Sequence, residues 1–393
     1  MVDRKNFCVA GIGGAGCRIV SYLAKDAAAD TMRFIAIDTD ENGLGESLLS
    51  PEQTILAGSQ WRNGKGTGGN YIDGQRAVSH ERKNIEQLLA GADMLLICAG
   101  LGGGTASGGI PILLSCASNM HIPVISIVTT PFAVEGVARR KSADQSINEM
   151  LRIADAVIPV SNDLLFAGLD PATPLAEAFR ISAIEMARTV KALSTILCSG
   201  NLLNADFSDF SALLRRKKSN CALGIGVINS NEVTEFRAEK LFSQLLESPL
   251  LGGASRLCDA DAVIFTLSGG PELSISDAQS VFKLASGHIG KKTKILVGAS
   301  VDDASAGTLQ FTALAVNFEE NEIKADASGS RRKNKTPVSD SEDGQLTLPL
   351  SENEYNFGIM KNTIPVRWKG EELDVPTFQR KGLAVDSGKD ELF

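Results

Sequence analysis

Residues 94–109 read Met-Leu-Leu-Ile-Cys-Ala-Gly-Leu-Gly-Gly-Gly-Thr-Ala-Ser-Gly-Gly. The apolar run at the start of this segment predicts a strand buried on both faces, as in a parallel sheet. The consecutive glycines after it let backbone amides approach phosphate oxygens without hindrance from a Cβ atom. Thr105 can cap the helix expected over about residues 111–117, and the N-terminus of that helix favours negative charge. The segment therefore predicts a phosphate-binding turn between a strand and a helix, with a flexible turn that binds no ligand as the alternative.

The same alternation of apolar runs and amphipathic segments continues on both sides of this turn. Apolar runs predict further strands at residues 7–10, 34–37, 123–128 and 156–160. Helical patterns lie between the strands, at about residues 19–28, 81–90 and 138–153. This order predicts a doubly wound α/β domain built on a parallel sheet.

A long amphipathic helix and a smaller α/β unit follow. Apolar residues repeat at helical spacing over 174–197, which predicts a helix roughly 35 Å long. The residues of this stripe are Leu175, Phe179, Ala183, Met186, Val190, Leu193 and Leu197. After the helix we expect strands at 222–228, 262–267, 294–297 and 309–316, and helices at 233–246 and 277–286. The polar, aperiodic segment 319–372 predicts a disordered linker.

The length of 393 residues suits two domains that each bury a core. The fold class we predict is α/β, with a doubly wound parallel-sheet domain, a long central helix and a smaller α/β second domain. The boundaries we expect are 1–172, 173–200 and 201–318, followed by the linker 319–372 and a C-terminal peptide and tail over 373–393.

The composition excludes several classes of protein. There are 39 Lys and Arg against 47 Asp and Glu, so no basic excess supports general nucleic-acid binding. No apolar run of about 18 residues occurs, so we expect no membrane insertion, and the N-terminus has no signal-peptide layout. The seven cysteines form no C-x-x-C pair, which predicts reduced thiols in a cytoplasmic protein. The three histidines share no spacing with Cys or carboxylates, so we assign no metal site.

Two further glycine-rich segments permit two interpretations. Gly11-Ile-Gly-Gly-Ala-Gly16 satisfies G-x-G-x-x-G after a strand, and Asp38 ends the next strand. Alone, these residues suggest a dinucleotide-dependent oxidoreductase with Asp38 on the ribose. Gly64-Lys-Gly-Thr-Gly-Gly-Asn70 adds a third loop, and three such loops suggest a triphosphate surrounded by backbone amides. No G-x-x-x-x-G-K-[ST] motif occurs, which excludes a Walker-type site.

Gly102-Gly-Gly-Thr-Ala-Ser-Gly108 resembles the signature G-G-G-T-[GS]-x-G of the tubulin/FtsZ family. Further matches follow in the order of that family, at residues 35–40, 130–136, 161–163, 201–209, 248–251 and 298–302. The resemblance to bacterial FtsZ cell-division proteins spans about residues 5–318 and resumes at 373–381. It implies a filament-forming GTPase in which 1–172 is the GTP-binding domain and 201–318 the activation domain. The oxidoreductase interpretation leaves the segments 100–109 and 204–209 unexplained.

The resemblance also implies a set of nucleotide contacts, with GTP or GDP as the ligand and Mg²⁺ bound through the nucleotide. The implied contacts are Gly13, Gly14, Ala15, Gly16, Cys17, Arg18, Asp38, Gly68, Gly69, Gly102, Gly103, Gly104, Thr105, Ala106, Glu135, Arg139, Asn162, Phe179 and Ala183. Glu135 and Arg139 can equally be a surface ion pair at i and i+4. Phe179 can stack on a base or belong to the core stripe.

Catalysis is assigned to a second segment by the same resemblance. Asn204, Asp206 and Asp209 would enter the nucleotide site of the neighbouring subunit, where the two carboxylates position water for attack on the γ-phosphate. Without the resemblance, the two aspartates are residues favoured at a helix start. Because half of the site comes from the next subunit, hydrolysis would require a head-to-tail homopolymer.

Some positions depart from the pattern of FtsZ. Cys17 and Arg18 stand where Gly and Asn are usual, Asp38 stands where Asn is usual, and Ala106 replaces a glycine. Ala183 stands in place of the Asp that accepts hydrogen bonds from guanine, which predicts weaker base selectivity. A non-hydrolysing structural filament protein is therefore an alternative.

The C-terminal peptide has apolar anchors next to basic residues. By resemblance it would recruit a membrane-associated division adaptor to the filament, at the division site in the cytoplasm. The residues assigned to this contact are Asp374, Val375, Pro376, Phe378, Arg380 and Lys381. A degraded tail with chance similarity is the alternative.

Overall fold

The computed structural model describes residues 6–25, 32–45, 47–167, 169–198, 219–229, 236–301, 305–318, 367–368 and 371–372. The chain divides into two compact units, Met1–Ile323 and Lys324–Phe393. In the second unit, β11 (Arg367–Trp368) pairs antiparallel with β12 (Glu371–Glu372). Both short strands fall within the segment predicted to be a linker, and the rest of that segment lies outside the described residues.

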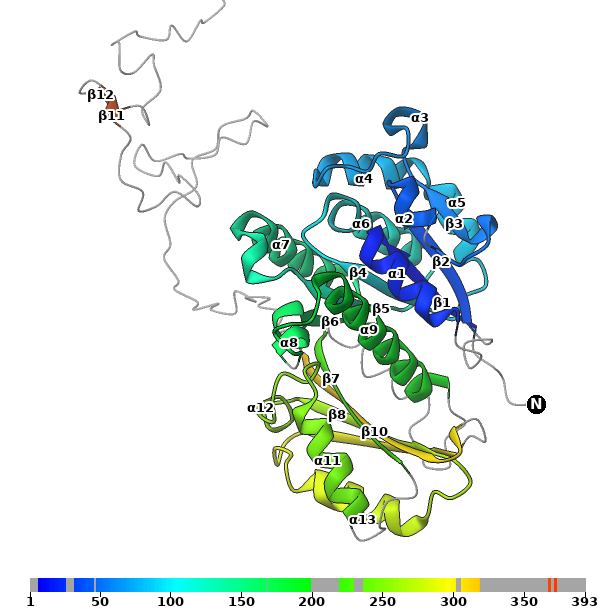
Figure 1. The fold of residues 1–393 in the computed structure, drawn as a ribbon, viewed down its shortest axis with the longest axis vertical. Helices are drawn as coiled ribbons and strands as arrows, with labels where there is room; N and C mark the ends of the chain where they lie inside the picture. The colour runs from blue at the N-terminus through cyan, green and yellow to red at the C-terminus, as the bar shows by residue number, and fades with distance from the viewer. Residues whose placement is uncertain are drawn as a thin grey trace, which may run out of the picture. The chain divides into compact units, whose positions relative to one another are not determined.

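The first unit is organised around a ten-stranded sheet with the order β3-β2-β1-β4-β5-β6-β7-β10-β8-β9 (Figure 1). The strands β1 to β7 pair in parallel, β10 runs antiparallel to β7 and β8, and β9 is parallel to β8. The strand bounds are β1 Phe7–Ile12, β2 Met32–Asp38, β3 Thr54–Leu56, β4 Met94–Gly100, β5 Val124–Thr130, β6 Ala156–Ser161, β7 Ser219–Asn229, β8 Ala262–Gly269, β9 Lys294–Val301 and β10 Thr308–Phe318. The predicted strands and the mostly parallel α/β fold are confirmed.

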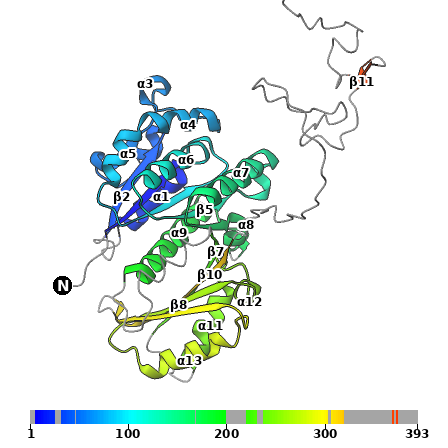
Figure 2. The same cartoon turned by 180° about the vertical axis from the view of Figure 1, so that it is seen from behind.

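Helices cover both faces of the sheet, as the views from the front and from behind show (Figures 1 and 2). One core lies beneath α1 and α9 and contains Val20 and Met186, while the opposite core lies beneath α4 to α7 and contains Leu113. A third core lies beneath α11 and α13 and contains Phe265. The bounds of these helices are α1 Gly13–Leu23, α4 Tyr71–His80, α5 Arg82–Leu89, α6 Gly104–Asn119, α7 Val137–Ile153, α9 Leu175–Cys198, α11 Arg237–Glu247 and α13 Ile275–Ser286.

Short helices make up the connections. Their bounds are α2 Glu41–Gly45, η2 Pro51–Gln53, α3 Ser59–Arg62, η3 Ala133–Glu135, α8 Asn162–Ala167 and α12 Ser255–Cys258. No helix among the described residues is long and apolar enough to cross a membrane. The predicted boundary between a first and a second domain stays a prediction.

Two helices begin earlier than the sequence predicts. We expected helices from about residues 19 and 111, whereas α1 begins at Gly13 and α6 at Gly104. The glycines therefore belong to the first helical turns, where N–H groups have no partner within the helix and remain available to a ligand. Pro111 lies inside α6 and does not start it.

The long helix α9 departs from its predicted stripe at its first residue. Met186, Val190 and Leu193 are fully buried, but the Leu175 side chain is 67% exposed. Leu175 is the first residue of α9, and burial of the helix starts one turn later, with Ala178. The prediction that Leu175 is buried was wrong because periodicity gives the face of a helix but not the length of the surface that covers it.

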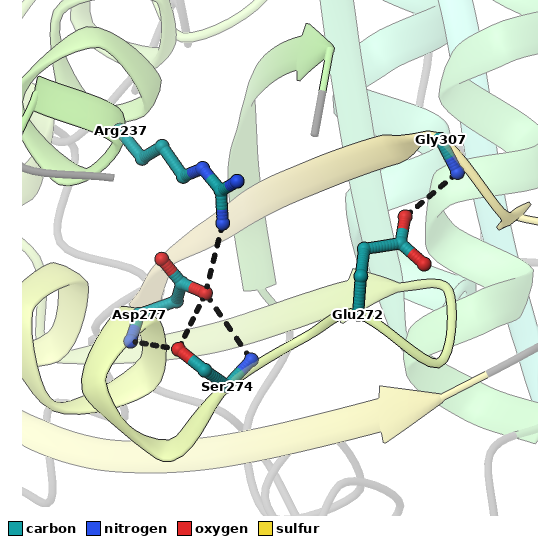
Figure 3. Close-up of polar contacts among 5 residues, drawn as sticks. All are labelled: Arg237, Glu272, Ser274, Asp277 and Gly307. Atoms are coloured by element: carbon teal, nitrogen blue, oxygen red, sulfur yellow. Dashed lines mark hydrogen bonds and ion pairs between the residues drawn. The ribbon is translucent and has the colours of Figure 1, made fainter. Parts of the chain in front are cut away.

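A buried ion pair links α11 to the start of α13 (Figure 3). The Asp277 carboxylate lies 3.4 Å from the Arg237 guanidinium and accepts hydrogen bonds from the Ser274 amide (3.1 Å) and hydroxyl (2.6 Å). Glu272 in the same loop accepts a hydrogen bond from the Gly307 amide at 2.7 Å. These contacts fix the loop before α13 to both α11 and the start of β10.

Candidate functional site

A cavity of about 420 Å³ opens where β4 and β5 end and α1, α6 and α9 meet. Such a position, at the carboxyl ends of parallel strands, is where open α/β sheets bind ligands. Its lining residues are Gly13, Gly14, Ala15, Arg18, Ile19, Gly100, Leu101, Gly103, Gly104, Thr105, Ala106, Thr129, Pro131, Glu135, Arg139, Asn162, Phe179, Ser182, Ala183 and Met186. The fold thus brings together 13 of the residues singled out from the sequence.

One end of the cavity is formed by the N-termini of α1 and α6. The N-cap residues Ile12 and Gly103 make no side-chain capping bond in the described structure. The N–H groups of the first turns are therefore left for a ligand, and two helix dipoles favour negative charge at this end. The geometry suits a phosphate chain.

Tight backbone contacts hold the phosphate-side loops. Gly102 adopts φ +88°, and a Cβ atom there would lie 3.0 Å from the Arg139 carbonyl oxygen. A Cβ atom on Gly104 would lie 2.3 Å from Thr67 Oγ1. The amide of Gly102 also donates to the Ser107 hydroxyl at 3.1 Å. Because each contact needs a bare backbone, glycine at 102 and 104 sets the shape of this end of the cavity.

The loop that carries Gly68 and Gly69 lies beside the start of α6. Both glycines have positive φ, of 59° and 86°, and neither lines the cavity. The next residue, Asn70, caps α4 by accepting from the amides of Ile72 (2.9 Å) and Asp73 (3.3 Å). A Cβ atom on Gly104 would also lie 2.7 Å from the Asn70 nitrogen. The loop is thus anchored next to the phosphate end, and its predicted contact with the γ-phosphate stays a prediction.

The opposite end of the cavity is apolar. It is lined by Ile19 of α1 and by Phe179, Ala183 and Met186 of α9. The half-buried Phe179 ring packs edge-on against Phe132 and Phe166, with a centroid distance of 5.7 Å to each. Phe179 therefore belongs to an aromatic cluster and also lines the cavity, and its stacking on a base stays a prediction.

Asn162 supplies an unsatisfied polar group to the cavity. It is the first residue of α8 and is 8% exposed. Its Oδ1 atom is buried and has no hydrogen-bond partner in the described part of the chain. A buried carbonyl oxygen without a partner costs about 1–3 kcal/mol, so this atom is expected to gain a donor from a bound ligand.

Glu135 and Arg139 form the ion pair that the sequence allowed. Arg139 Nη1 lies 2.5 Å from Glu135 Oε2, and Glu135 Oε1 accepts from the Phe132 amide at 2.9 Å. The Arg139 side chain is 58% exposed and both residues line the cavity. The predicted ion pair is therefore present, and the contact of these two residues with a nucleotide stays a prediction.

Three residues predicted to contact the nucleotide do not line the cavity, namely Gly16, Cys17 and Asp38. Cys17 is fully buried, and its thiol lies 3.5 Å from the Ile37 carbonyl oxygen. Burial raises the pKa of Cys17 well above its usual range, so its thiol stays protonated. Asp38 is 3% exposed, accepts from the Thr39 amide at 2.7 Å, and has a pKa raised by burial. Their direct contacts with a nucleotide stay predictions.

Seven lining residues were not predicted from the sequence to be site residues. They are Ile19, Gly100, Leu101, Thr129, Pro131, Ser182 and Met186. A signal for two of them was present, because Ser182 and Met186 follow Phe179 at the spacing of one helix face. Ile19 lies within α1, and the other four are at or just after the ends of β4 and β5, a position that no residue type marks.

Some predicted residues lie outside the described part of the chain. These are Asn204, Asp206, Asp209, Asp374, Val375, Pro376, Phe378, Arg380 and Lys381. Within the described ranges, no three His, Cys, Asp or Glu side chains are grouped as metal ligands would be.

Comparisons with known proteins agree with this fold. Residues 6–170 match the model for the GTPase domain of the tubulin/FtsZ family, and residues 220–319 match that for the C-terminal domain of the FtsZ family. An empty FtsZ dimer from M. jannaschii is 26% identical, with a TM-score of 0.71 over 80% of this chain and 88% of that one. A GTPγS-bound CetZ2 protofilament from Haloferax volcanii is 22% identical, with a TM-score of 0.66 over 81% of this chain and 94% of that one. The similarity thus extends to FtsZ and CetZ proteins and does not single out bacterial FtsZ.

Proposed function

Because this chain belongs to the tubulin/FtsZ family, we propose that it binds GTP in the cavity between α1, α6 and α9 and hydrolyses it in a head-to-tail filament. The observation that supports this proposal most is that the glycine-rich N-termini of α1 and α6 line one cavity whose opposite end is apolar. The end formed by the N-termini of α1 and α6 suits a triphosphate, and the apolar end suits a nucleoside.

Within the cavity the phosphates would lie against the first turns of α1 and α6. Arg139, beside the Gly102 backbone, would add positive charge at this end. Mg²⁺ would be bound through the nucleotide's own oxygens, where it neutralises phosphate charge. The described lining fits this arrangement, because its one carboxylate, Glu135, is already held by Arg139 and the Phe132 amide.

The side chains that line the cavity also support catalysis by a neighbouring subunit. Among the described lining residues there is no carboxylate besides Glu135, so none there is free to polarise the attacking water. Asn204, Asp206 and Asp209 of the next subunit would supply that function. The proposed biological role is a filament at the bacterial division site in the cytoplasm, joined to a membrane-associated adaptor through the peptide 374–381.

Phosphate release from GTP and Mg²⁺, measured with light scattering across protein concentrations, tests the proposal. Turnover per subunit is expected to appear above a critical concentration together with scattering, and ATP serves as the nucleotide control. Scattering without phosphate release would favour the non-hydrolysing structural filament. Absence of both signals would refute the proposal.

Mixing two inactive variants tests whether the site is shared. Asp206→Ala retains the cavity, whereas Gly103→Val retains the loop but extends a side chain from a position with no atom within 4 Å of the added Cβ. Each variant alone is expected to be inactive, and an equimolar mixture should recover about a quarter of wild-type turnover, the fraction of interfaces that pair both intact halves if mixing is random. Asp259→Ala, at an exposed position away from the cavity, is the matched control and should keep full turnover.

A further inference from the structure

Three segments of the chain are joined beside the phosphate end of the cavity by one buried residue, Thr39. Thr39 directly follows β2 and is fully buried. Its hydroxyl lies 2.6 Å from the hydroxyl of Thr105, in the first turn of α6. Its carbonyl oxygen accepts from the Gly66 amide at 2.9 Å, in the glycine-rich loop 64–70. Thr39 therefore connects β2, this loop and α6, although it does not line the cavity itself.

The proton between the two hydroxyl groups comes from Thr39. A threonine hydroxyl donates one hydrogen bond and accepts up to two. Among the described residues, the Thr39 hydroxyl has no partner besides Thr105, so it donates to Thr105 or buries an unsatisfied proton. Thr105 has another acceptor for its own proton, because its side chain also hydrogen-bonds to the Asp38 carboxylate. Donation from Thr39 to Thr105 is therefore the arrangement that satisfies all three groups.

This direction leaves the Thr105 proton at the phosphate end of the cavity. Thr105 lines the cavity and is 8% exposed. The Asp38 carboxylate lies beside the same end, since a Cβ atom on the lining residue Gly14 would be 3.8 Å from Asp38 Oδ2. With its oxygen occupied by the Thr39 donor, Thr105 offers its proton only to Asp38 or to a phosphate oxygen. Successive hydrogen bonds also polarise one another, which strengthens the last bond of the series.

We propose that Thr39 is a positioning residue for nucleotide binding, which acts by holding the Thr105 hydroxyl so that it donates to a bound phosphate. This inference rests on the nucleotide site proposed above. Thr39 would have no contact with the nucleotide, and its whole effect would pass through Thr105. The backbone bond from Gly66 to Thr39 places the loop 64–70 against the same turn of α6.

Substitutions at position 39 separate the hydroxyl from the shape of the side chain. Valine has the shape of threonine, but one of its methyl groups would take the place of the hydroxyl, 2.6 Å from Thr105 Oγ1. Non-bonded heavy atoms need about 3.5 Å, so the Thr105 hydroxyl would have to move by about 1 Å or rotate away. Serine keeps the hydroxyl and should retain the bond. Alanine removes the hydroxyl without a new methyl contact.

Calorimetric titration of the full chain with GDP and Mg²⁺ tests the proposal without hydrolysis, on variants whose folding is checked by circular dichroism. Thr39→Val should weaken GDP binding by about tenfold, the scale of one hydrogen bond to a charged group. Thr39→Ser should stay within about twofold of wild type, because the donor is retained. If Thr39→Val does not fold, Thr39→Ala is measured in its place, with a loss of at least about threefold expected.

A double-variant cycle shows whether Thr39 acts through Thr105. In a Thr105→Val background, Thr39→Val should change GDP affinity by less than about twofold, because no hydroxyl is left to position. The matched control is Thr189→Val in α9. Thr189 is also fully buried, donates to the Glu185 carbonyl oxygen at 2.8 Å and does not line the cavity. This control should leave GDP affinity unchanged.

Three results would overturn the proposal. The first is wild-type GDP affinity in Thr39→Val, or in Thr39→Ala where that variant replaces it. The second is an equal loss of affinity in Thr39→Ser and Thr39→Val, because the hydroxyl would then not be the cause. The third is an equal effect of Thr39→Val with and without the Thr105 hydroxyl, which would indicate a general structural role. Absence of GDP and GTP binding by the wild-type chain would instead contradict the nucleotide site itself.

Discussion

Substitution by alanine should have different effects at two neighbouring glycines at the start of α6: loss of stability at Gly104 and weaker GTP binding at Gly103. In Gly104→Ala the new Cβ atom would lie 2.3 Å from Thr67 Oγ1, 2.5 Å from the Asn70 oxygen and 2.7 Å from the Asn70 nitrogen. Two of these three atoms belong to backbone, so a side-chain rotation cannot relieve the overlap. In Gly103→Ala the added Cβ atom meets nothing within 4 Å, and φ at Gly103 is −90°.

The structure sets the size of the expected difference. Relief of the overlap at Gly104 requires the Asn70 backbone to move away by about 1 Å. That movement also disturbs the cap on α4, in which Asn70 accepts from the Ile72 and Asp73 amides. Overpacking costs about 1–3 kcal/mol and loss of the cap about 1 kcal/mol, so Gly104→Ala should lower the free energy of unfolding by about 2–4 kcal/mol. Gly103→Ala should change it by less than about 0.5 kcal/mol.

Urea unfolding followed by circular dichroism measures both free energies, and titration with GTP measures affinity on the folded proteins. Gly103→Ala should bind GTP more weakly at unchanged stability, because its methyl group extends into the cavity. Equal stability of the two variants would refute the contact between the Asn70 loop and α6 as the reason for glycine at 104. Undiminished GTP binding by Gly103→Ala would refute the placement of the phosphates at this turn.

Four further predictions concern ionisable side chains and the effect of their burial. Arg237→Met should lower the free energy of unfolding, measured by urea titration, by about 1–3 kcal/mol. The reason is that Asp277 loses its ion-pair partner but keeps its hydrogen bonds to the loop before α13. A decrease below about 0.5 kcal/mol would contradict this prediction. Burial raises the pKa of Cys98 to about 12, so the unfolded thiol ionises first and stability should fall as pH rises above about 9, while Cys98→Ala should show a smaller fall. At pH 8, maleimide followed by peptide mapping should label the exposed Cys258 well before Cys98. Burial also raises the pKa of Asp38, so the contribution of this residue to stability is largest at low pH and declines as the pH rises through its pKa in the folded protein. The stability of Asp38→Asn relative to wild type should therefore be greater at pH 7 than at pH 4. An equal stability difference between the two proteins at both pH values would contradict the cost of burying the charged carboxylate.

Much of the fold was predictable because the determinants are local. The apolar runs of β1, β2, β4, β5 and β6 have the length and composition of strands buried on both faces, and all five appear where the sequence predicts them. Helix starts were less accurate, since glycine is a poor helix former in isolation. At the start of α6 the close contact with the Asn70 loop, which leaves no room for a Cβ atom at Gly104, outweighs that propensity.

By itself, the sequence determined the alternation of strands and helices and the glycine turns that follow β1 and β4, because both depend on residue type and spacing along the chain. Only the tertiary structure decided which residues of those motifs reach the cavity. Cys17 and Arg18 are neighbours on α1, but successive residues of a helix point about 100° apart. When α1 packs on the sheet, Cys17 is therefore fully buried and Arg18 borders the cavity. Asp38, at the end of β2, is likewise buried and does not line the cavity. Ser182 lines the cavity because α9 packs against α1.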